Sequence, residues 1–310
     1  MTDEILGYIY EHFKLTTAEE KNAFVLSLIP EARKLWNSYQ NGKPENDYDN
    51  ELAQIVYLLR YYLPYAKPIR EILEQLKTIE FAHILAPLTT STDLDVAFFG
   101  AGPAPELYGF LDYIHNNNWS VKSITAHLFD EKKWITARKI AKEKILPKIL
   151  NQRDRKFIRN LLIADWWMAF DSAGVPEGWE FIPKCKLAWF QNCFNESTIE
   201  DVVFSISMVG TQIAPRSLII LIDFNRNKNE TIRFNKILKD IIDFKYNIDN
   251  PKLTLIRQGA IDPSNYDVNS GLSSDLKNKL FYVSRSATDE TSGLILKTRF
   301  EYNYAIFLKK

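Results

Sequence analysis

Short apolar runs alternate with helical patterns from Asp93 onward, and this alternation restricts the possible folds more than any other feature of the chain. Strands that are apolar on both sides need helices over both faces of their sheet. Helices are expected between the first runs, over 105–116 and 133–144. We therefore predict an α/β fold with a seven-stranded, mostly parallel sheet. Its strands are expected at residues 96–99, 123–130, 157–163, 187–190, 218–223, 253–256 and 302–308.

The first ninety residues show helical spacing of apolar side chains and no hairpin signal. Thr17 and Glu20 form a capping-box pattern that predicts the start of a helix. Pro30 is expected to end or kink that helix, because proline cannot donate the backbone hydrogen bond. Another helix is expected over about 68–84.

We predict two domains: a helical one over 1–90 and the sheet-containing one over 91–310. The chain holds 39 Lys and Arg against 39 Asp and Glu, so no global field favours nucleic acid or a membrane. Its two cysteines indicate neither a disulfide scaffold nor a zinc site, and we expect no metal. The acidic N-terminus and the absence of a run of about 18 apolar residues make a cytoplasmic protein the default expectation.

Gly100, Ala101 and Gly102 lie between the first predicted strand and a helix. Glycine at such a turn lets the backbone approach a ligand closely. Asp130 ends the next strand, where a carboxylate can accept both ribose hydroxyls of an adenosine cofactor. A nicotinamide site is disfavoured because its third glycine is replaced by Pro105 and the acid lies too far along. A plain tight turn remains the alternative.

Residues 98–104 read Phe-Phe-Gly-Ala-Gly-Pro-Ala and resemble the first motif of class I S-adenosylmethionine-dependent methyltransferases. Asp130, with the phenylalanine before it, resembles the acidic second motif. Residues 163–166 are similar to the third motif, and 190–196 to the fourth-strand motif beside the transferred methyl. The resemblance covers about 93–310 and identifies no subfamily. It implies a Rossmann-like fold whose last strand is antiparallel, with S-adenosyl-L-methionine as cofactor.

The resemblance also implies a set of cofactor-binding residues. In it, Asp165 faces the adenine amine, and Trp134 packs on the adenine or simply belongs to the core. Phe98 and Ala104 depart from the family, which usually has an acid and a third glycine there. Glu106 is the candidate to replace the acid and hold the cofactor's amino group, although a helix-capping role is an equal alternative. The full set is Phe99, Gly100, Ala101, Gly102, Glu106, Asp130, Trp134, Asp165, Trp166, Phe190, Gln191 and Asn192.

Asn195 and Glu196 are the candidate catalytic residues, for contact with the methyl acceptor or for removing its proton. The alternative is that they cap the next helix. None of the four histidines pairs by spacing with Asp or Cys, and His127 is expected to be a polar core residue. Four tyrosines between residues 57 and 65 either line an acceptor pocket or pack against the sheet. The resemblance implies an enzyme acting on a small-molecule or protein acceptor of unspecified identity.

The segment 132–159 is strongly basic. Between Glu131 and Arg159 there are eleven Lys and Arg against three acids. We expect a solvated helix face, because Lys and Arg recur all around the predicted helix. An RNA-modifying methyltransferase that uses this patch is one alternative. The other is a non-catalytic cofactor-binding protein of the same fold, since the acid at position 98 is missing.

Overall fold

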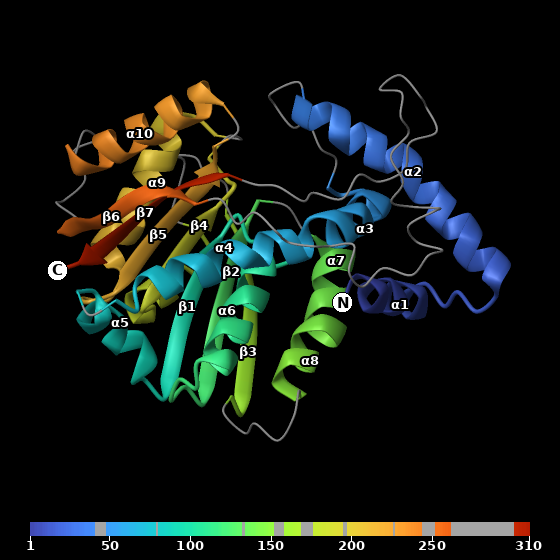
Figure 1. Cartoon of the computed structure of the whole chain (residues 1–310), viewed down its shortest axis with the longest axis horizontal. Helices are drawn as coiled ribbons and strands as arrows, with labels where there is room; N and C mark the ends of the chain where they lie inside the picture. Colours follow the sequence, from blue (N-terminus) through green and yellow to red (C-terminus); the bar gives the residue numbers. More distant parts are fainter. Residues whose placement is uncertain are drawn as a thin grey trace.

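The computed structural model describes most of the chain (Figure 1). The described residues are 1–40, 48–78, 80–131, 134–151, 158–168, 176–194, 197–225, 227–243, 252–261 and 301–310. Within them, no helix has the length and apolar character needed to cross a membrane.

Five helices precede the sheet in the described residues: α1 (Thr2–His12), α2 (Ala18–Gln40), α3 (Glu51–Arg60), α4 (Tyr62–Gln75) and α5 (Ala82–Thr89). The predicted capping box is confirmed, since Glu20 N–H donates to Thr17 Oγ1 at 3.1 Å and Thr17 N–H donates to Glu20 Oε2 at 2.9 Å. The helix does not end at Pro30, because α2 continues through it, and a kink there stays a prediction. Val25, Leu28 and other apolar side chains of α2 are buried, and this packing outweighs the missing hydrogen bond.

The helix predicted over 68–84 is also wrong in its bounds. Pro68 lies inside α4, which begins six residues earlier and ends at Gln75. A separate helix, α5, then covers Ala82–Thr89. The helix starts early because its first turn buries Tyr62, Leu63 and Tyr65, so tertiary packing sets the boundary.

In the described part of the chain, a single seven-stranded sheet has the order β3-β2-β1-β4-β5-β7-β6. Only β7 runs antiparallel to its neighbours, and it lies between β5 and β6. This confirms the predicted Rossmann-like sheet with an antiparallel last strand. The strands are β1 (Asp93–Phe99), β2 (Ser123–Asp130), β3 (Asn160–Trp167), β4 (Leu187–Gln191), β5 (Leu218–Phe224), β6 (Leu253–Ile261) and β7 (Tyr302–Lys309).

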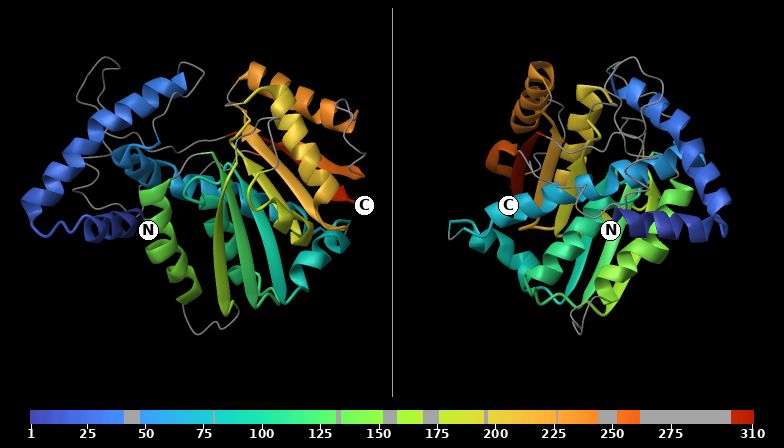
Figure 2. Two further views of the ribbon diagram at one scale, coloured as in Figure 1. Left: turned by 180° about the vertical axis from the view of Figure 1, so that it is seen from behind. Right: turned by 45° about the vertical axis from the view of Figure 1, so that its right-hand side comes forward.

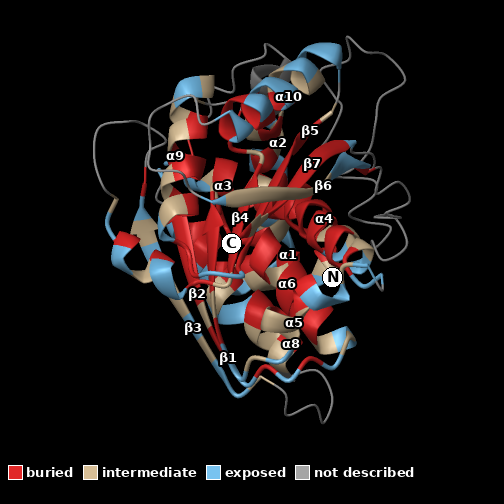
Figure 3. Cartoon of the chain, turned by 90° about the vertical axis from the view of Figure 1, so that its left-hand side faces the viewer, coloured by how far each residue is buried: buried red, intermediate tan, exposed pale blue. Residues whose placement is uncertain are grey.

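Helices cover both faces of the sheet (Figures 1 and 2). Val96 and Phe98 of β1 belong to one hydrophobic cluster with α4 and α6, whereas Ala97 and Phe99 belong to a second cluster with α9 and α10. The burial colouring shows strands buried between these layers (Figure 3). The covering helices are α6 (Pro105–Asn116), α7 (Ile135–Ile140), α8 (Leu146–Asn151), α9 (Ile199–Gln212) and α10 (Lys228–Ile242).

Several predicted boundaries in the sheet region are wrong; for example, β1 begins at Asp93 and β6 extends to Ile261. The third strand is Asn160–Trp167, so Asp165 lies inside it and not beyond its end. The helix predicted over 133–144 consists of α7 followed by a π-helical turn over Ala141–Ile145. Strand bounds shift because β3 pairs with β2 residue by residue as far as Asp130, and that pairing extends the strand. The division into two domains stays a prediction, since one hydrophobic cluster includes residues from both ranges.

Candidate functional site

The candidate site lies at the carboxyl end of β1, where the strand order reverses. β1 has β2 on one side and β4 on the other, so the loops that follow these strands diverge there. In open α/β sheets, ligands bind at this kind of switch point. Gly100 and Gly102 occupy the turn after β1 with φ angles of 64° and 49°. A Cβ on Gly100 would lie 2.6 Å from the Cβ of Cys193, so glycine is required by space as well as by conformation.

Ala104 also has a left-handed backbone, with φ at 64°. It stands where the family pattern has a third glycine, so the conformation is retained although the residue is not. Its N–H donates to the carbonyl of Ala101 at 2.6 Å and closes the turn. α6 then begins at Pro105, at the first helical position that favours proline. The turn therefore has the geometry that the sequence predicts, at the cost of a strained alanine.

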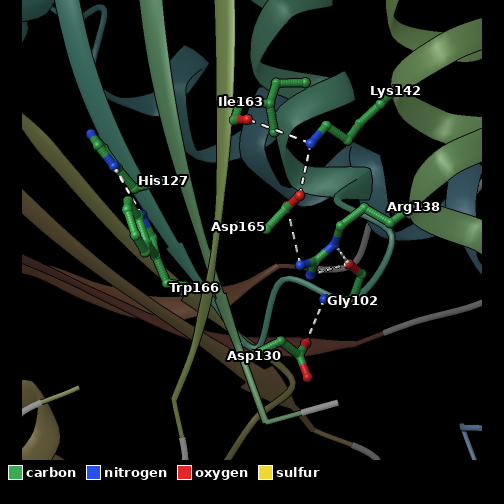
Figure 4. A network of polar contacts seen from close by, with 8 residues as sticks. All are labelled: Gly102, His127, Asp130, Arg138, Lys142, Ile163, Asp165 and Trp166. Carbon is green, nitrogen blue, oxygen red and sulfur yellow. Dashed lines mark hydrogen bonds and ion pairs between the residues drawn. The ribbon is translucent and has the colours of Figure 1, made fainter. Parts of the chain in front are cut away.

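Asp130 reaches the glycine turn directly. Its Oδ2 accepts a hydrogen bond from Gly102 N–H at 2.6 Å, and the side chain is buried (Figure 4). The acid predicted at the end of the second strand and the predicted glycine turn are thus in contact.

Arg138 of α7 fixes the turn from the other side. Its Nε donates to the Gly102 carbonyl at 2.9 Å and its Nη2 to the same oxygen at 2.5 Å (Figure 4). Its Nη1 lies 3.2 Å from Asp165 Oδ1. The expectation that the basic helix is a solvated face is wrong at this position, because the Arg138 side chain is only 7% exposed. The reason is that both acceptors lie beneath α7, and their bonds compensate for burying the guanidinium.

Asp165 and Trp166, neighbours in the third motif, lie on opposite faces of β3. Asp165 is partly exposed and pairs with Arg138 and with Lys142, whose Nζ is 2.7 Å from Oδ2. Trp166 instead donates from Nε1 to His127 Nδ1 at 3.2 Å (Figure 4). Successive strand residues point to opposite faces, so these two side chains do not meet at one ligand.

His127 is a buried core residue, as expected. Nδ1 accepts from Trp166, so the proton resides on Nε2, which faces Asp95 Oδ1 at 3.3 Å. Burial lowers the pKa of His127, and Asp95 opposes that shift. The imidazole also stacks on Phe181, with 5.1 Å between the ring centroids. Both nitrogens are used within the fold, which excludes the free lone pair that a general base needs.

Trp134 lies over the second glycine of the turn. A Cβ on Gly102 would be 3.5 Å from two carbons of the indole. The indole is buried against Tyr48 and Tyr57, with centroid distances of 4.4 and 4.8 Å. Its Nε1 has no hydrogen-bond partner among the described residues. The tryptophan is thus both packed in an aromatic cluster and adjacent to the candidate site.

The four tyrosines of α3 and α4 form a packed series. Tyr57, Tyr61 and Tyr65 are in mutual ring contact, with the Tyr61–Tyr65 centroids 5.3 Å apart. Tyr65 also contacts Phe224 at the end of β5. Tyr62 faces elsewhere, against Tyr108 of α6. Most of this series is buried, so packing accounts for it in the described residues.

The last residues of β4 and the residue that follows it differ in their contacts. Phe190 stacks on Phe99 at 4.2 Å inside the core. Gln191 donates from Nε2 to the Tyr65 carbonyl at 2.8 Å and accepts from Trp189 at 3.0 Å, so its amide is used in the fold. Asn192 has a left-handed backbone, and both polar atoms of its side chain are buried without a hydrogen-bond partner among the described residues. A buried amide without hydrogen bonds costs free energy, which indicates a ligand that would supply the missing hydrogen-bond partners.

The catalytic candidates Asn195 and Glu196 lie outside the described residues. Thr198, which follows them, is the N-cap residue of α9. Its Oγ1 accepts from Asp201 N–H at 3.1 Å. Just beside the candidates, Arg233 of α10 donates to the Phe194 carbonyl at 2.6 Å. Sequence spacing gives no signal for that long-range contact.

Glu106 lies in the first turn of α6, beside the glycine turn. Its side chain is 4% exposed, and Oε2 has no hydrogen-bond partner among the described residues. Burial raises the pKa of this carboxyl well above its usual range. The carboxyl is also hydrogen-bonded to its own backbone N–H in the first turn of α6, which lowers the pKa but does not offset the effect of burial. The N-cap residue of α6 is Ala104, which makes no side-chain cap bond.

Most described cations of the basic segment pair within the chain. Lys144 of the π-helical turn lies 2.8 Å from Glu11, and Lys148 pairs with Glu4. Both acids belong to α1, so these pairs tie the N-terminal helix to α8 and the turn before it. In the described part of the chain, no group of three or more His, Cys, Asp or Glu is placed to hold a metal ion.

No protein-family model matches the sequence, and no curated protein matches it significantly. Several solved methyltransferases are similar in structure. An O-methyltransferase family protein from Burkholderia thailandensis is 10% identical with a TM-score of 0.47, covering 92% of this chain and 72% of that one. A loganic acid methyltransferase with S-adenosylhomocysteine is 10% identical with a TM-score of 0.42, covering 82% and 96%. Magnesium protoporphyrin IX methyltransferase from Synechocystis PCC 6803 with bound S-adenosylmethionine is 10% identical at 0.38, covering 79% and 80%. Likenesses this distant say nothing about what the present chain binds or modifies.

Proposed function

We propose that this protein is an S-adenosylmethionine-dependent methyltransferase whose acceptor is a small molecule or a protein. The observation that carries the proposal is the contact between Asp130 and Gly102 at the switch point of the sheet. In this contact, the glycine turn lies against an acid at the end of the neighbouring strand. This combination suits a ribose, whose hydroxyls need charged acceptors, with the rest of the ligand lying along the glycine backbone.

The buried polar atoms near this edge fit a ligand of that kind. The Asn192 amide and Glu106 Oε2 are buried and unpartnered, and they follow β4 and β1, the strands on either side of the switch point. A bound zwitterionic cofactor offers both donors and acceptors to such groups. Trp134 would cover the ligand at Gly102, whereas Asp165 would reach an adenine amine only by sharing its oxygens with Arg138 and Lys142.

S-adenosylmethionine supplies an electrophilic sulfonium methyl, and its transfer leaves S-adenosylhomocysteine. The chain's own residues then have to position donor and acceptor and exclude water, which accounts for much of the rate when the acceptor is already nucleophilic. Asn195 and Glu196 remain our candidates for acceptor contact and proton removal. Arg233 holds the loop on either side of them through the Phe194 and Ser197 carbonyls.

Calorimetry with S-adenosylhomocysteine, S-adenosylmethionine, NAD and ATP tests the proposal. The two sulfur cofactors should bind clearly more tightly than the other two. Asp130→Asn keeps an oxygen acceptor for Gly102 N–H but loses the charge toward the ribose, so affinity should fall at least about tenfold for a lost charged hydrogen bond of about 1.5–3 kcal/mol. Asp130→Ala should bind no better. Asp93→Ala, at the opposite end of β1, is the control and should bind normally. Preference for NAD would overturn the proposal.

The RNA alternative gains no support from the basic segment. Arg138 and Lys142 are engaged with Asp165, and Lys144 and Lys148 with α1. Phosphate contacts need cations that are available to solvent. We expect no submicromolar binding to structured RNA at about 150 mM salt, as measured by fluorescence anisotropy. Binding of that strength would favour an RNA acceptor over a small-molecule or protein acceptor.

A further inference from the structure

Glu106 is placed where burial disfavours a carboxylate charge more strongly than the hydrogen bond from its own backbone N–H stabilises it. It is almost fully buried between α4 and α6, and Oε2 receives no hydrogen bond from the described residues. Tyr62 of α4 belongs to the same surroundings. It is fully buried, and its hydroxyl has no hydrogen-bond partner in the described part of the chain. Burying a charge without a partner is costly, and a protein normally avoids this by leaving the group neutral.

The charges that face Glu106 do not remove this cost. Asp130 at the end of β2 disfavours a second negative charge nearby, and Arg138 of α7 favours it. The Arg138 guanidinium, however, donates to the Gly102 carbonyl and to Asp165. Tyr62 and its neighbour Tyr108 add no positive charge. Burial is the largest effect, so the pKa of Glu106 lies well above its usual range.

The end of the strand before the turn carries no acid, because Asp93 and Asp95 of β1 lie toward its start. Phe98 of β1 is fully buried and packs on Phe110 of α6, with the ring centroids 6.3 Å apart. An ammonium group that binds beside the glycine turn would therefore find its counter-charge on α6 and not on β1. Glu106, beside the turn that holds Gly102, is the described carboxyl that combines this position with an unpartnered oxygen.

We propose that Glu106 is a neutral carboxylic acid in the ligand-free protein and becomes ionised when it receives the α-ammonium group of the cofactor. Its proton passes to water, so binding of the amino-acid end of the cofactor releases up to one proton. The binding site thus selects ligands by their ammonium charge as well as by their adenosine. This inference rests on the proposed function and adds to it that Glu106 recognises the ammonium charge of the cofactor.

Because Glu106 loses its proton when the ligand binds, the affinity for the ligand should depend on pH. Below the ligand-free pKa of Glu106, ionising the carboxyl for the ligand costs free energy that falls as the pH rises. Affinity for a ligand with an ammonium group should therefore rise by up to about tenfold per pH unit in this range, as for any binding that releases one proton. A ligand without the amino-acid end should show no such dependence on Glu106.

Calorimetry at about pH 7 in two buffers of different ionisation enthalpy measures the released protons. The probes are S-adenosylhomocysteine and 5′-methylthioadenosine, which lacks the amino-acid end. With wild-type protein, we expect proton release for the first and none for the second. Glu106→Gln keeps the shape of the neutral acid, so it should abolish the release and weaken S-adenosylhomocysteine binding at least about tenfold, as expected for a lost charged hydrogen bond. It should change methylthioadenosine binding little.

Infrared spectroscopy of the wild-type protein supplies a test that needs no variant. A protonated carboxylic acid band should be present without ligand and disappear when S-adenosylhomocysteine is added. If S-adenosylhomocysteine binds without releasing a proton, or if the band persists, the inference is overturned while the proposed function stands. If S-adenosylhomocysteine does not bind at all, both are overturned.

Discussion

Replacing Arg138 by methionine tests whether α7 fixes the glycine turn. Methionine keeps most of the apolar stem but removes the guanidinium. The Gly102 carbonyl then loses both of its side-chain donors, which lie at 2.9 and 2.5 Å in the structure. Asp165 loses one cation but keeps Lys142 at 2.7 Å. The substitution should therefore destabilise the glycine turn more than it destabilises β3, the strand that contains Asp165.

The magnitude follows from the burial of these groups. A hydrogen bond to a charged group contributes about 1.5–3 kcal/mol, and both donors share one carbonyl, so we count that acceptor once. The Asp165 pair is partly exposed and adds about 0–1 kcal/mol. We expect Arg138→Met to lower the free energy of unfolding by about 1.5–4 kcal/mol, the sum of these two ranges.

Urea denaturation measures this loss, and Lys139→Met is the matched control. Lys139 is the next residue on the same helix but is exposed, so its replacement should cost less than about 0.5 kcal/mol. Arg138→Lys should recover only part of the loss, because an ammonium cannot reproduce the fork of donors. Equal stabilities for Arg138→Met and Lys139→Met would refute the assignment of Arg138 to the turn.

Two further predictions concern the fold. Gly109→Ala should destabilise the protein by about 1–3 kcal/mol, the usual cost of overpacking, because its Cβ would lie 2.0 Å from the Ala66 carbonyl oxygen. Gly7→Ala, with nothing within 4 Å, should stabilise it by about 0.5–1 kcal/mol, and urea unfolding of both variants checks the opposite signs. Because burial lowers the pKa of His127 in the folded state, its contribution is complete above about pH 6.5 and is lost as the pH falls through the lower folded-state pKa. Unfolding measured between about pH 7 and 5 should therefore show a weaker pH dependence in His127→Asn than in the wild type, and equal slopes would contradict this reading.

The segment from β1 through β2 could be predicted from the sequence because its signals are local. An apolar run, two glycines, Pro105 at a helix start and an acid at the end of the next strand each act within a few residues. Packing between distant segments has no such signature. Pro30 looked like a helix break because the missing hydrogen bond is visible in the sequence, whereas the burial of Val25 and Leu28 is not.

The site was predicted in part for the same reason. Asp130 and Gly102 each have a recognisable local context, and they do meet. Arg138 lay among so many cations that its spacing suggested a solvated face. Its burial depends on the Gly102 carbonyl, 36 residues away along the chain. The separation of Asp165 from Trp166 likewise follows from the extended bounds of β3, which pairing with β2 decides.

The N-terminal helices help to position the residues of the candidate site. α7 has no side-chain cap of its own at its N-cap residue, Trp134. Its first amides are instead satisfied from α3, where Gln54 Oε1 accepts from Thr136 N–H at 2.9 Å and from Ala137 N–H at 3.0 Å. Because unpaired amides at a buried helix start are costly, α3 fixes where α7 begins. Arg138 directly follows Ala137 on α7. The position of the Gly102 carbonyl therefore depends on Gln54, a residue from the first ninety.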